Sequence, residues 1–294
     1  AKPSAQALAV KQGVILAVGS KKELLAHQDS MTKVIDLQGN TVIPGFVDAH
    51  SHFTGVGLQA IVANLLAAPD GQVNNIKDLQ SAMTDYIQSS PIVKDYNVAI
   101  GFNYDDSQLD EKRHPTRHDL DAISTSLPIV IMHQSGHIGV YNSKALDMMG
   151  ITAESENPPG GIIEREADGK TPNGVMQENA HFTLFFKFIP QFSEKDSIMV
   201  YKAGEASYLA NGFTTVQDGK TDLASLNLLP KMAASPGFDV DIISYADIAA
   251  IGDDKILHSD LMSSEYTDGF RIGGVKLTFD GSPQGKTAWF TEPY

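Results

Sequence analysis

Short apolar runs separated by turn-forming residues dominate the first part of the chain. They predict strands at residues 8–11, 14–19 and 34–37 and a short helix at 21–27. Gly13 lies between the first two runs, as in a hairpin turn. We therefore expect residues 1–43 to form part of a small β-sandwich module.

A different pattern follows at residues 46–49, which are mostly apolar without alternation. Such a run is typical of a strand that is buried on both faces. Pro44-Gly45 marks its start, and His50-Ser51-His52 follows it directly. We expect this strand to belong to the core of a larger domain.

The middle of the chain is more broken, with many Pro, Gly, Asn and Asp residues. Its apolar positions predict a helix over 76–87, strands at 98–102 and 128–132, and a loop at 157–161. Regular order returns with a predicted helix at 193–210, which Asn211-Gly212 ends. Strands are then expected at 213–218, 238–245 and 274–280. Strands alternating with helices predict a parallel α/β sheet.

Composition narrows the classes of partner. The net charge of −14 repels nucleic acid and anionic membrane surfaces, so we expect neither as a partner. No apolar run is long enough to span a bilayer. The absence of cysteine excludes disulfides and thiolate metal sites. We predict a cytoplasmic location, with the periplasm as the alternative, and homo-oligomerisation stays open.

The strongest chemical signal is the pair His50 and His52. Side chains two apart on a strand share a face, so both imidazoles aim at one point. Neutral imidazoles are ligands for Zn, Fe, Mn and Ni. The alternative is a pair of polar loop residues, but a position at the end of a buried strand favours a site, and Asp48 shares the face.

The motif over residues 42–52 resembles the first-strand motif of the amidohydrolase superfamily. Other segments narrow the resemblance to its YtcJ-like branch, the amidohydrolase 3 family, which includes N-substituted formamide deformylases. These segments are 135–137, 142–146, 174–178, 212–218 and 275–282. The resemblance covers nearly the whole chain.

The resemblance implies a TIM-type (β/α) barrel of the metal-dependent hydrolase kind, an α/β fold, with a flanking β-sandwich module. By strand count, only the first four barrel strands are present, in residues 44–54 and 206–294. Residues 55–205 are then a large insertion, or lid domain, after strand 1. In this family two His ligands end the first strand, and a Lys on the fourth, often carboxylated, bridges two metals.

Lys276 falls on the fourth predicted strand, so we expect His50, His52 and Lys276 to bind a divalent metal, with Zn favoured and one or two ions. The alternatives for Lys276 are a pair with Asp280 or a solvent-exposed amine. Asp218 and Asp280 are candidates for supporting the metal ligands, although capping a helix is an equal alternative for Asp218.

Within the insertion, His137 and Glu178 are candidates for contact with the substrate. A hydrogen-bonded role inside the insertion is an equal alternative for His137, and an ion-pair or surface role is favoured for Glu178. We interpret His133 as a structural residue. His114, His118 and His181 lack a motif, and we expect them to be surface or core histidines.

The implied reaction is hydrolysis of a non-peptide C–N bond, in an amide or formamide, by metal-activated water. The catalytic Asp of the family and two further His ligands are expected beyond residue 294. We therefore expect a longer natural protein and an inactive 294-residue fragment. Completion by a second copy and an inactive relic are the alternatives. Competing functions are a deaminase of the same superfamily, with one metal and no carboxylated Lys, and a non-catalytic binding protein.

Overall fold

The computed structural model describes residues 4–252, 258–278, 280–281, 283 and 288–292. The chain divides into two compact units, Ala1–Pro44 and Gly45–Tyr294, which are treated separately below. All the candidate metal ligands lie in the second unit.

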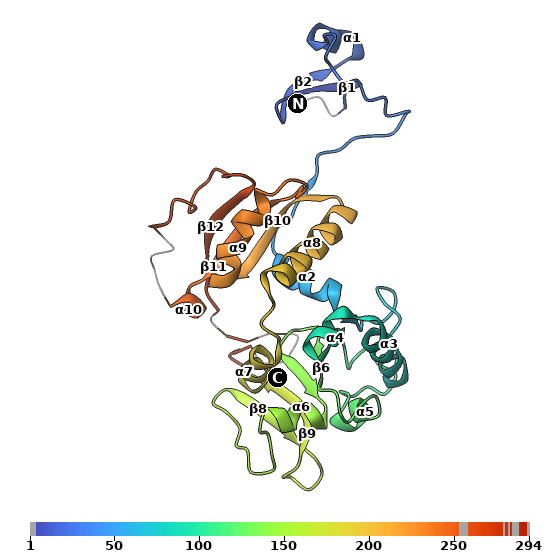
Figure 1. Ribbon diagram of the computed structural model, residues 1–294, viewed down its shortest axis with the longest axis vertical. Helices are drawn as coiled ribbons and strands as arrows, with labels where there is room; N and C mark the ends of the chain where they lie inside the picture. Colours follow the sequence, from blue (N-terminus) through green and yellow to red (C-terminus); the bar gives the residue numbers. More distant parts are fainter. Residues whose placement is uncertain (1–3, 253–257, 279, 282, 284–287, 293–294) are drawn as a thin grey trace. The chain divides into compact units, whose positions relative to one another are not determined.

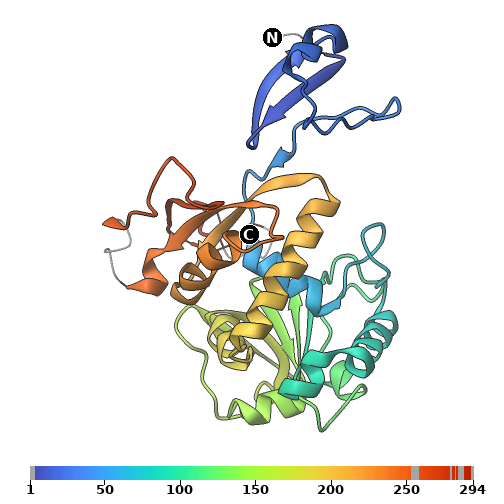
Figure 2. The same cartoon turned by 45° about the horizontal axis from the view of Figure 1, so that its top comes forward.

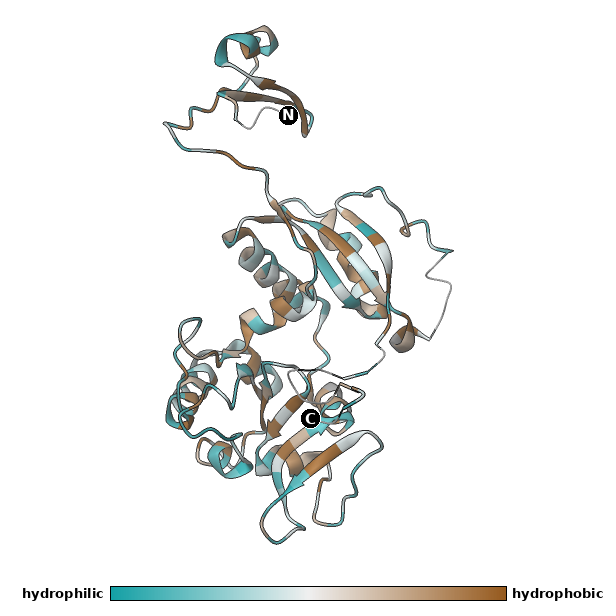
Figure 3. Ribbon diagram, turned by 180° about the vertical axis from the view of Figure 1, so that it is seen from behind, coloured by the Kyte–Doolittle hydropathy of each residue, from teal (hydrophilic) through white to brown (hydrophobic). Residues whose placement is uncertain are grey.

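The first unit contains the predicted hairpin. Strands β1 (Ala7–Lys11) and β2 (Val14–Gly19) pair antiparallel through a turn at Gln12-Gly13, where both residues have positive φ. Helix α1 (Lys21–Leu24) and a 3-10 turn (Leu25–His27) follow, after a capping box formed by Ser20 and Glu23. Figure 3 shows apolar residues along both strands of the hairpin.

The strand expected at residues 34–37 is wrong. These residues lie outside any strand, because no described segment forms a hydrogen-bonded ladder with them. An apolar run becomes a strand only when a neighbour satisfies its backbone groups. The hydrophobic side chains Val34 and Ile35 are accordingly exposed.

The second unit is organised around a parallel sheet of four strands. In the order β12-β11-β10-β3, the strands are Phe270–Lys276, Asp241–Asp247, Phe213–Thr221 and Phe46–Val47. This parallel sheet confirms the predicted α/β layout. The strand expected at 46–49 with both faces buried is wrong in extent and burial, because β3 covers only Phe46–Val47 and lies at the edge of the described sheet, where these residues are 49% and 65% exposed. The fourth strand begins at Phe270 rather than at residue 274 and ends at Lys276, and Phe279 lies outside the described residues.

Helices pack against this sheet, as Figure 2 shows. They are α2 (Phe53–Ile61), α8 (Glu194–Ala210), α9 (Leu223–Ala233) and the short α10 (Ile248–Ile251). Helix α8 starts where predicted, with the Ser193 side chain accepting the backbone N–H of Asp196. The core between helices and strands includes Phe53, Leu229, Ile242 and Phe270.

Helices α2 and α8 approach each other closely. A Cβ added at Gly57 of α2 would lie 2.3 Å from the carbonyl oxygen of Val200 in α8. A Cβ added at Gly204 of α8 would lie 3.2 Å from the Cα of Gly57. The two glycines therefore allow backbone contact between the helix that leaves the His50-Ser51-His52 segment and the helix that leads into β10.

Residues between these two helices build a second sheet. Its order is β4-β5-β6-β7-β9-β8, with strands Ala63–Asn64, Ala99–Tyr104, Ile129–His133, Ile138–Tyr141, Pro172–Glu178 and Gly161–Arg165. Strands β4, β5 and β6 are parallel, and the other pairings are antiparallel. We call it the insertion sheet (Figure 1).

Five helices accompany the insertion sheet: α3 (Ile76–Ser89), α4 (Pro91–Tyr96), α5 (Arg117–Asp121), α6 (Ser143–Met148) and α7 (Asn179–Phe188). Helix α3 confirms the helix predicted at 76–87, and it buries Ile76, Leu79 and Met83. In the part of the chain that the structure describes, no helix is long and apolar enough to cross a membrane.

Candidate metal and substrate site

The two histidines of the opening motif lie side by side after β3. The ring centroids of His50 and His52 are 5.9 Å apart, and the rings meet edge to face. Both side chains are exposed. The spacing of two residues thus brings the two imidazoles to one end of the parallel sheet.

Asp48 holds this segment in place. Its Oδ1 accepts the backbone N–H of His50 at 3.1 Å, and its Oδ2 accepts the backbone N–H of Gln217 in β10 at 3.1 Å. The Ser51 hydroxyl donates to Asp48 and contacts the hydroxyl of Tyr208. Burial raises the pKa of Tyr208 to about 12, so its proton stays available for this network.

The end of β10 touches the same segment through Gly219. The N–H of Gly219 donates to the carbonyl of Ser51 at 2.8 Å. A Cβ at position 219 would lie 2.6 Å from that oxygen. Glycine is therefore needed here, and it fixes the backbone between the two histidines against the second strand.

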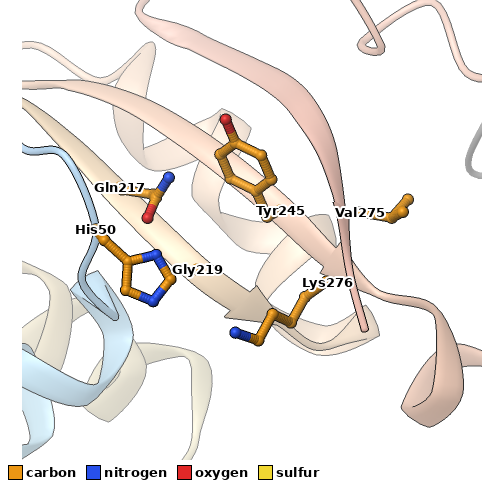
Figure 4. Close-up of a pocket in the computed structure, with 6 residues that line it drawn as sticks. All are labelled: His50, Gln217, Gly219, Tyr245, Val275 and Lys276. Carbon is orange, nitrogen blue, oxygen red and sulfur yellow. The ribbon is translucent and has the colours of Figure 1, made fainter. Parts of the chain in front are cut away.

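A cavity of about 300 Å³ opens beside His50. Its lining residues are His50, Gln217, Gly219, Tyr245, Val275 and Lys276. Figure 4 shows the Lys276 amine extending toward the side of the cavity that His50 occupies. The structure thus brings His50 and Lys276 to one cavity, whereas the predicted ligand His52 is not among the residues that line it.

His52 lies beside Asp218 of β10, with which it forms an isolated β-bridge. Desolvation lowers the pKa of His52, while the nearby Asp218 carboxylate acts in the opposite direction. The imidazole is therefore neutral at pH 7, which is the form that binds metals.

Asp218 itself is buried, and desolvation raises its pKa. Its Oδ1 accepts the backbone N–H of Thr54 at 3.1 Å, and its Oδ2 accepts the Thr54 hydroxyl at 3.3 Å. Thr54 belongs to the first turn of α2, so Asp218 stabilises that helix end. Its support of a metal ligand stays a prediction.

Asp280 lies apart from the cavity-lining residues. It is exposed, and its Oδ2 accepts the backbone N–H of Trp289 at 3.1 Å. The contacts of the described residues include no ion pair between Asp280 and Lys276. Its supporting role also stays a prediction.

His137 and Glu178, the two candidates for substrate contact, lie next to each other at the insertion sheet. His137 Nδ1 lies 2.9 Å from both carboxylate oxygens of Glu178, and both side chains are partly buried. Glu178 has a positive φ of 49°, which is strained for a residue with a side chain. Neither residue is among those that line the cavity at His50.

The remaining histidines have separate environments. His181 is fully buried, with Nδ1 3.0 Å from the Tyr141 hydroxyl, and His118 is an exposed partner of Glu166 at 3.0 Å. These two are a core and a surface histidine, as expected. His114 and His133 instead lie together, with ring centroids 5.8 Å apart.

Comparisons with known proteins decide the family. The model of the amidohydrolase family matches residues 33–294. The chain belongs to the amidohydrolase family. This confirms the resemblance to the amidohydrolase 3 and YtcJ-like proteins.

Three curated relatives place this amidohydrolase more closely. It is 30% identical to the N-substituted formamide deformylase of Arthrobacter pascens, over 79% of this chain and 42% of that protein. It is 31% identical to the exoenzymes regulatory protein AepA of Pectobacterium carotovorum, over 99% and 63%. It is 26% identical to the putative amidohydrolase YtcJ of Bacillus subtilis, over 98% and 53%. The chain spans about half the length of the curated relatives it matches.

A solved structure supports the fold of this amidohydrolase. The uncharacterized metal-dependent hydrolase from Pyrococcus furiosus superposes with a TM-score of 0.67 at 22% identity, over 98% of this chain and 55% of that one. This likeness shows that the parallel sheet and its surroundings are those of the amidohydrolase fold.

Four cavity residues of this amidohydrolase were not predicted as site residues by the sequence analysis: Gln217, Gly219, Tyr245 and Val275. Gln217 lies directly before Asp218, and its position in a strand places it on the opposite face. The parallel arrangement predicts that strand ends converge, so residues 217 and 219 could have been included. No sequence motif marks Tyr245 of β11, because the other residues that line the cavity come from other strands.

Proposed function

We propose that the chain carries part of the site of a metal-dependent hydrolase that acts on non-peptide C–N bonds. One observation carries this proposal: His50, from the end of the first strand, and Lys276, from the end of the fourth, line one cavity. Enzymes with parallel barrel strands place their reacting groups at these strand ends.

The donor set at this end of the sheet fits a divalent cation. His50 and His52 offer two imidazoles, with His52 held neutral, and no cysteine competes for softer metals. A cation held by His50, His52 and Lys276 would supply Lewis-acid activation of water and of a carbonyl. Zn²⁺ is the ion we favour.

Lys276 is the least conventional member of this set. A protonated amine repels a cation, so Lys276 joins the site only after carboxylation, which replaces the positive charge with a carbamate anion. Its position at the last residue of β12 leaves its amine free to extend into the cavity (Figure 4). We propose that Lys276 is carboxylated when metal is bound.

Gln217 is proposed to orient the substrate. Its side chain is 8% exposed and lines the cavity, and its Oε1 is buried without a hydrogen-bond partner in the described part of the chain. A buried acceptor of this kind is stabilised by a donor. The N–H of an amide or formamide substrate supplies one. The formamide class is suggested by the name of the Arthrobacter relative, N-substituted formamide deformylase.

Metal analysis tests the ligand assignment. We expect purified protein loaded with Zn²⁺ to retain the ion after gel filtration, and His50→Ala and His52→Ala each to lower the retained amount. His27→Ala is the matched control, because His27 lies in the first unit. Equal retention by all variants would refute the assignment.

Mass spectrometry and activity separate the competing functions. A peptide containing Lys276 that is heavier by one CO₂ under native conditions supports a hydrolase with a bridging carbamate. One metal at the His50 site, counted as the metal that His50→Ala/His52→Ala loses relative to wild type, and an unmodified lysine favour the deaminase alternative. Because the 294-residue chain is expected to be inactive alone, assays of the longer protein with N-substituted formamides and simple amides test the substrate class. There, Gln217→Leu is expected to lower kcat/KM by about tenfold, as loss of one neutral hydrogen bond worth roughly 1.4 kcal/mol does.

A further inference from the structure

A second cluster of possible metal ligands lies in the insertion sheet. Asp105 and Asp106 follow the last residue of β5, and His133 is the last residue of the neighbouring strand β6. These strands are parallel, and Tyr104 pairs with His133 in their register. The carboxyl ends of adjacent parallel strands are where α/β sheets bind ligands.

The distances within the cluster suit one ion. His133 Nε2 lies 3.2 Å from Asp106 Oδ1 and 3.7 Å from Asp105 Oδ1. One ligand atom from each of the three residues falls within 4.8 Å of the other two. Metal–ligand bonds of about 2.1 Å separate neighbouring ligand atoms by about 3.0–3.4 Å, so only small movements of the carboxylates are needed.

His133 provides the observation that points to a ligand. The residue is 8% exposed, and its buried Nε2 lies at ion-pair distance from Asp106 but lacks a hydrogen bond of good geometry. A buried polar atom of this kind is stabilised by a well-placed partner. A cation between the imidazole and the carboxylates would satisfy all three groups.

The carboxylates are held toward this position. Asp105 Oδ1 accepts the backbone N–H of Ser107 at 2.8 Å, and its Oδ2 accepts the side-chain amide of Gln108 at 3.2 Å. The Ser107 hydroxyl also donates to Oδ1 at 2.7 Å. A carboxylate has about four lone-pair sites, so these three bonds orient Asp105 and leave one site, on Oδ2, for an ion. Asp106 lies 3.6 Å from Nδ1 of His114, which is itself 3.1 Å from the Tyr104 hydroxyl.

We propose that Asp105, Asp106 and His133 bind one divalent first-row transition ion, of the Zn²⁺ or Mn²⁺ class, in the insertion sheet. This site shares no residue with the cavity at His50 and does not depend on the proposed hydrolase function. An ion there would join the ends of β5 and β6. It changes the interpretation of His133 from a structural residue to a ligand.

Ser135 gives the proposal a spectroscopic consequence. His133 Nδ1 accepts the backbone N–H of Ser135 at 3.1 Å, and the Ser135 hydroxyl lies 2.9 Å from the same nitrogen. A neutral ring in this arrangement carries its proton on Nε2. An ion on Nε2 requires the proton on Nδ1, where it donates to the Ser135 hydroxyl, and the backbone N–H of Ser135 then loses this acceptor. Metal binding should therefore switch the tautomer of His133.

Zinc titration of a double variant tests the proposal. His50→Ala/His52→Ala removes the first candidate site, so the ion that remains belongs elsewhere. We expect calorimetry to give one Zn²⁺ per chain in this background, with at least tenfold weaker binding when Asp106→Asn is added. Asp110→Asn is the matched control, because Asp110 is exposed and lies outside the cluster. No binding in the double variant, or binding that Asp106→Asn leaves unchanged, would overturn the proposal.

Nitrogen NMR of the histidine rings gives a second, independent readout. We expect Zn²⁺ to move the His133 proton from Nε2 to Nδ1 in the double variant, at one equivalent. Circular dichroism first establishes that each variant folds, and Asp105→Asn replaces Asp106→Asn where folding is lost. A His133 tautomer that does not respond to bound Zn²⁺ would place the ion elsewhere. The outcome is independent of the Lys276 and formamide tests, so the two proposals fail separately.

Discussion

Gly219 of β10 lies directly against the carbonyl of Ser51, to which its N–H donates at 2.8 Å. The contact ties the second strand to the backbone between the two candidate histidine ligands. A side chain at this position would press on that carbonyl, with 2.6 Å between the new Cβ and the oxygen.

We therefore predict that Gly219→Ala moves the segment carrying His50 and His52. Forcing a methyl group into a packed position costs about 1–3 kcal/mol of folding free energy. We also expect weaker Zn²⁺ binding, because the His50 and His52 imidazoles would no longer point toward one ion. Denaturant unfolding and zinc titration measure the two effects. Lys220→Arg is the control at the neighbouring, half-exposed position. Wild-type behaviour of Gly219→Ala would show that the segment adjusts freely.

The contact between α2 and α8 gives a second prediction. Gly57→Ala places a Cβ 2.3 Å from the Val200 carbonyl, so the helices must separate. We expect a loss of about 1–3 kcal/mol of stability. Gly55→Ala in the same helix meets only the His52 Cβ at 3.4 Å, and it should be neutral or gain about 0.5–1 kcal/mol from helix propensity. Equal stabilities for the two variants would contradict this packing.

His181 makes stability depend on pH. Its burial, with a smaller contribution from the nearby His137, lowers its pKa to about 3. In the unfolded chain the pKa of His181 has its ordinary value of about 6.5, so the unfolded chain binds a proton at pH values where the folded chain keeps His181 neutral. Stability should therefore fall as pH decreases below about 6.5, by up to about 1.4 kcal/mol per pH unit from this group.

Thermal or urea unfolding between pH 7 and pH 5 checks this prediction, because most carboxylates stay ionised in that range. His181→Gln cannot titrate, and we expect a flatter dependence in the variant even where its stability is lower. His118→Gln is the control, since His118 is exposed and paired with Glu166. The same slope in wild type and His181→Gln would show that other groups govern the dependence.

Asp218 allows its two candidate roles to be separated. Asp218→Asn keeps an acceptor for the Thr54 amide but removes the negative charge beside His52. If the charge supports the ligand, Zn²⁺ affinity should fall by about 10–100-fold with little loss of stability. Thr54→Val removes only the hydroxyl bond and should leave the affinity unchanged. A loss of stability without a loss of affinity would assign Asp218 to the helix end alone.

The fold could be predicted from the sequence where local patterns were strong. The prediction failed where an element depends on neighbouring segments. Helix α8 was predictable because a capping serine and Asn211-Gly212 mark both ends. The start of β12 was not, because Gly273 and Gly274 lack the side chains that indicate a strand. A Cβ at Gly273 would lie 2.7 Å from the Ile243 side chain and force a shift, and one at Gly274 would lie 3.1 Å from the Tyr245 ring, a tight contact.

The candidate site was likewise predictable only where the signal in the sequence was local. The spacing of His50 and His52 is local, so it predicted their approach correctly. Lys276 was reached by counting strands, and the cavity contains it together with His50. Gln217 and Tyr245 join them only through the pairing of separate strands, which no short motif encodes. His133 and Asp105 were missed for the same reason, since 28 positions separate them in sequence.

The backbone contact at Gly57 and Gly204 also bears on which substitutions the chain tolerates. The segment from Val62 to the start of α8 is joined to the parallel sheet through α2 and α8, whose backbones meet at these two glycines. This contact leaves the two helices little freedom to shift relative to each other. Substitutions within the segment between them are therefore expected to leave His50 and Lys276 at the ends of their strands.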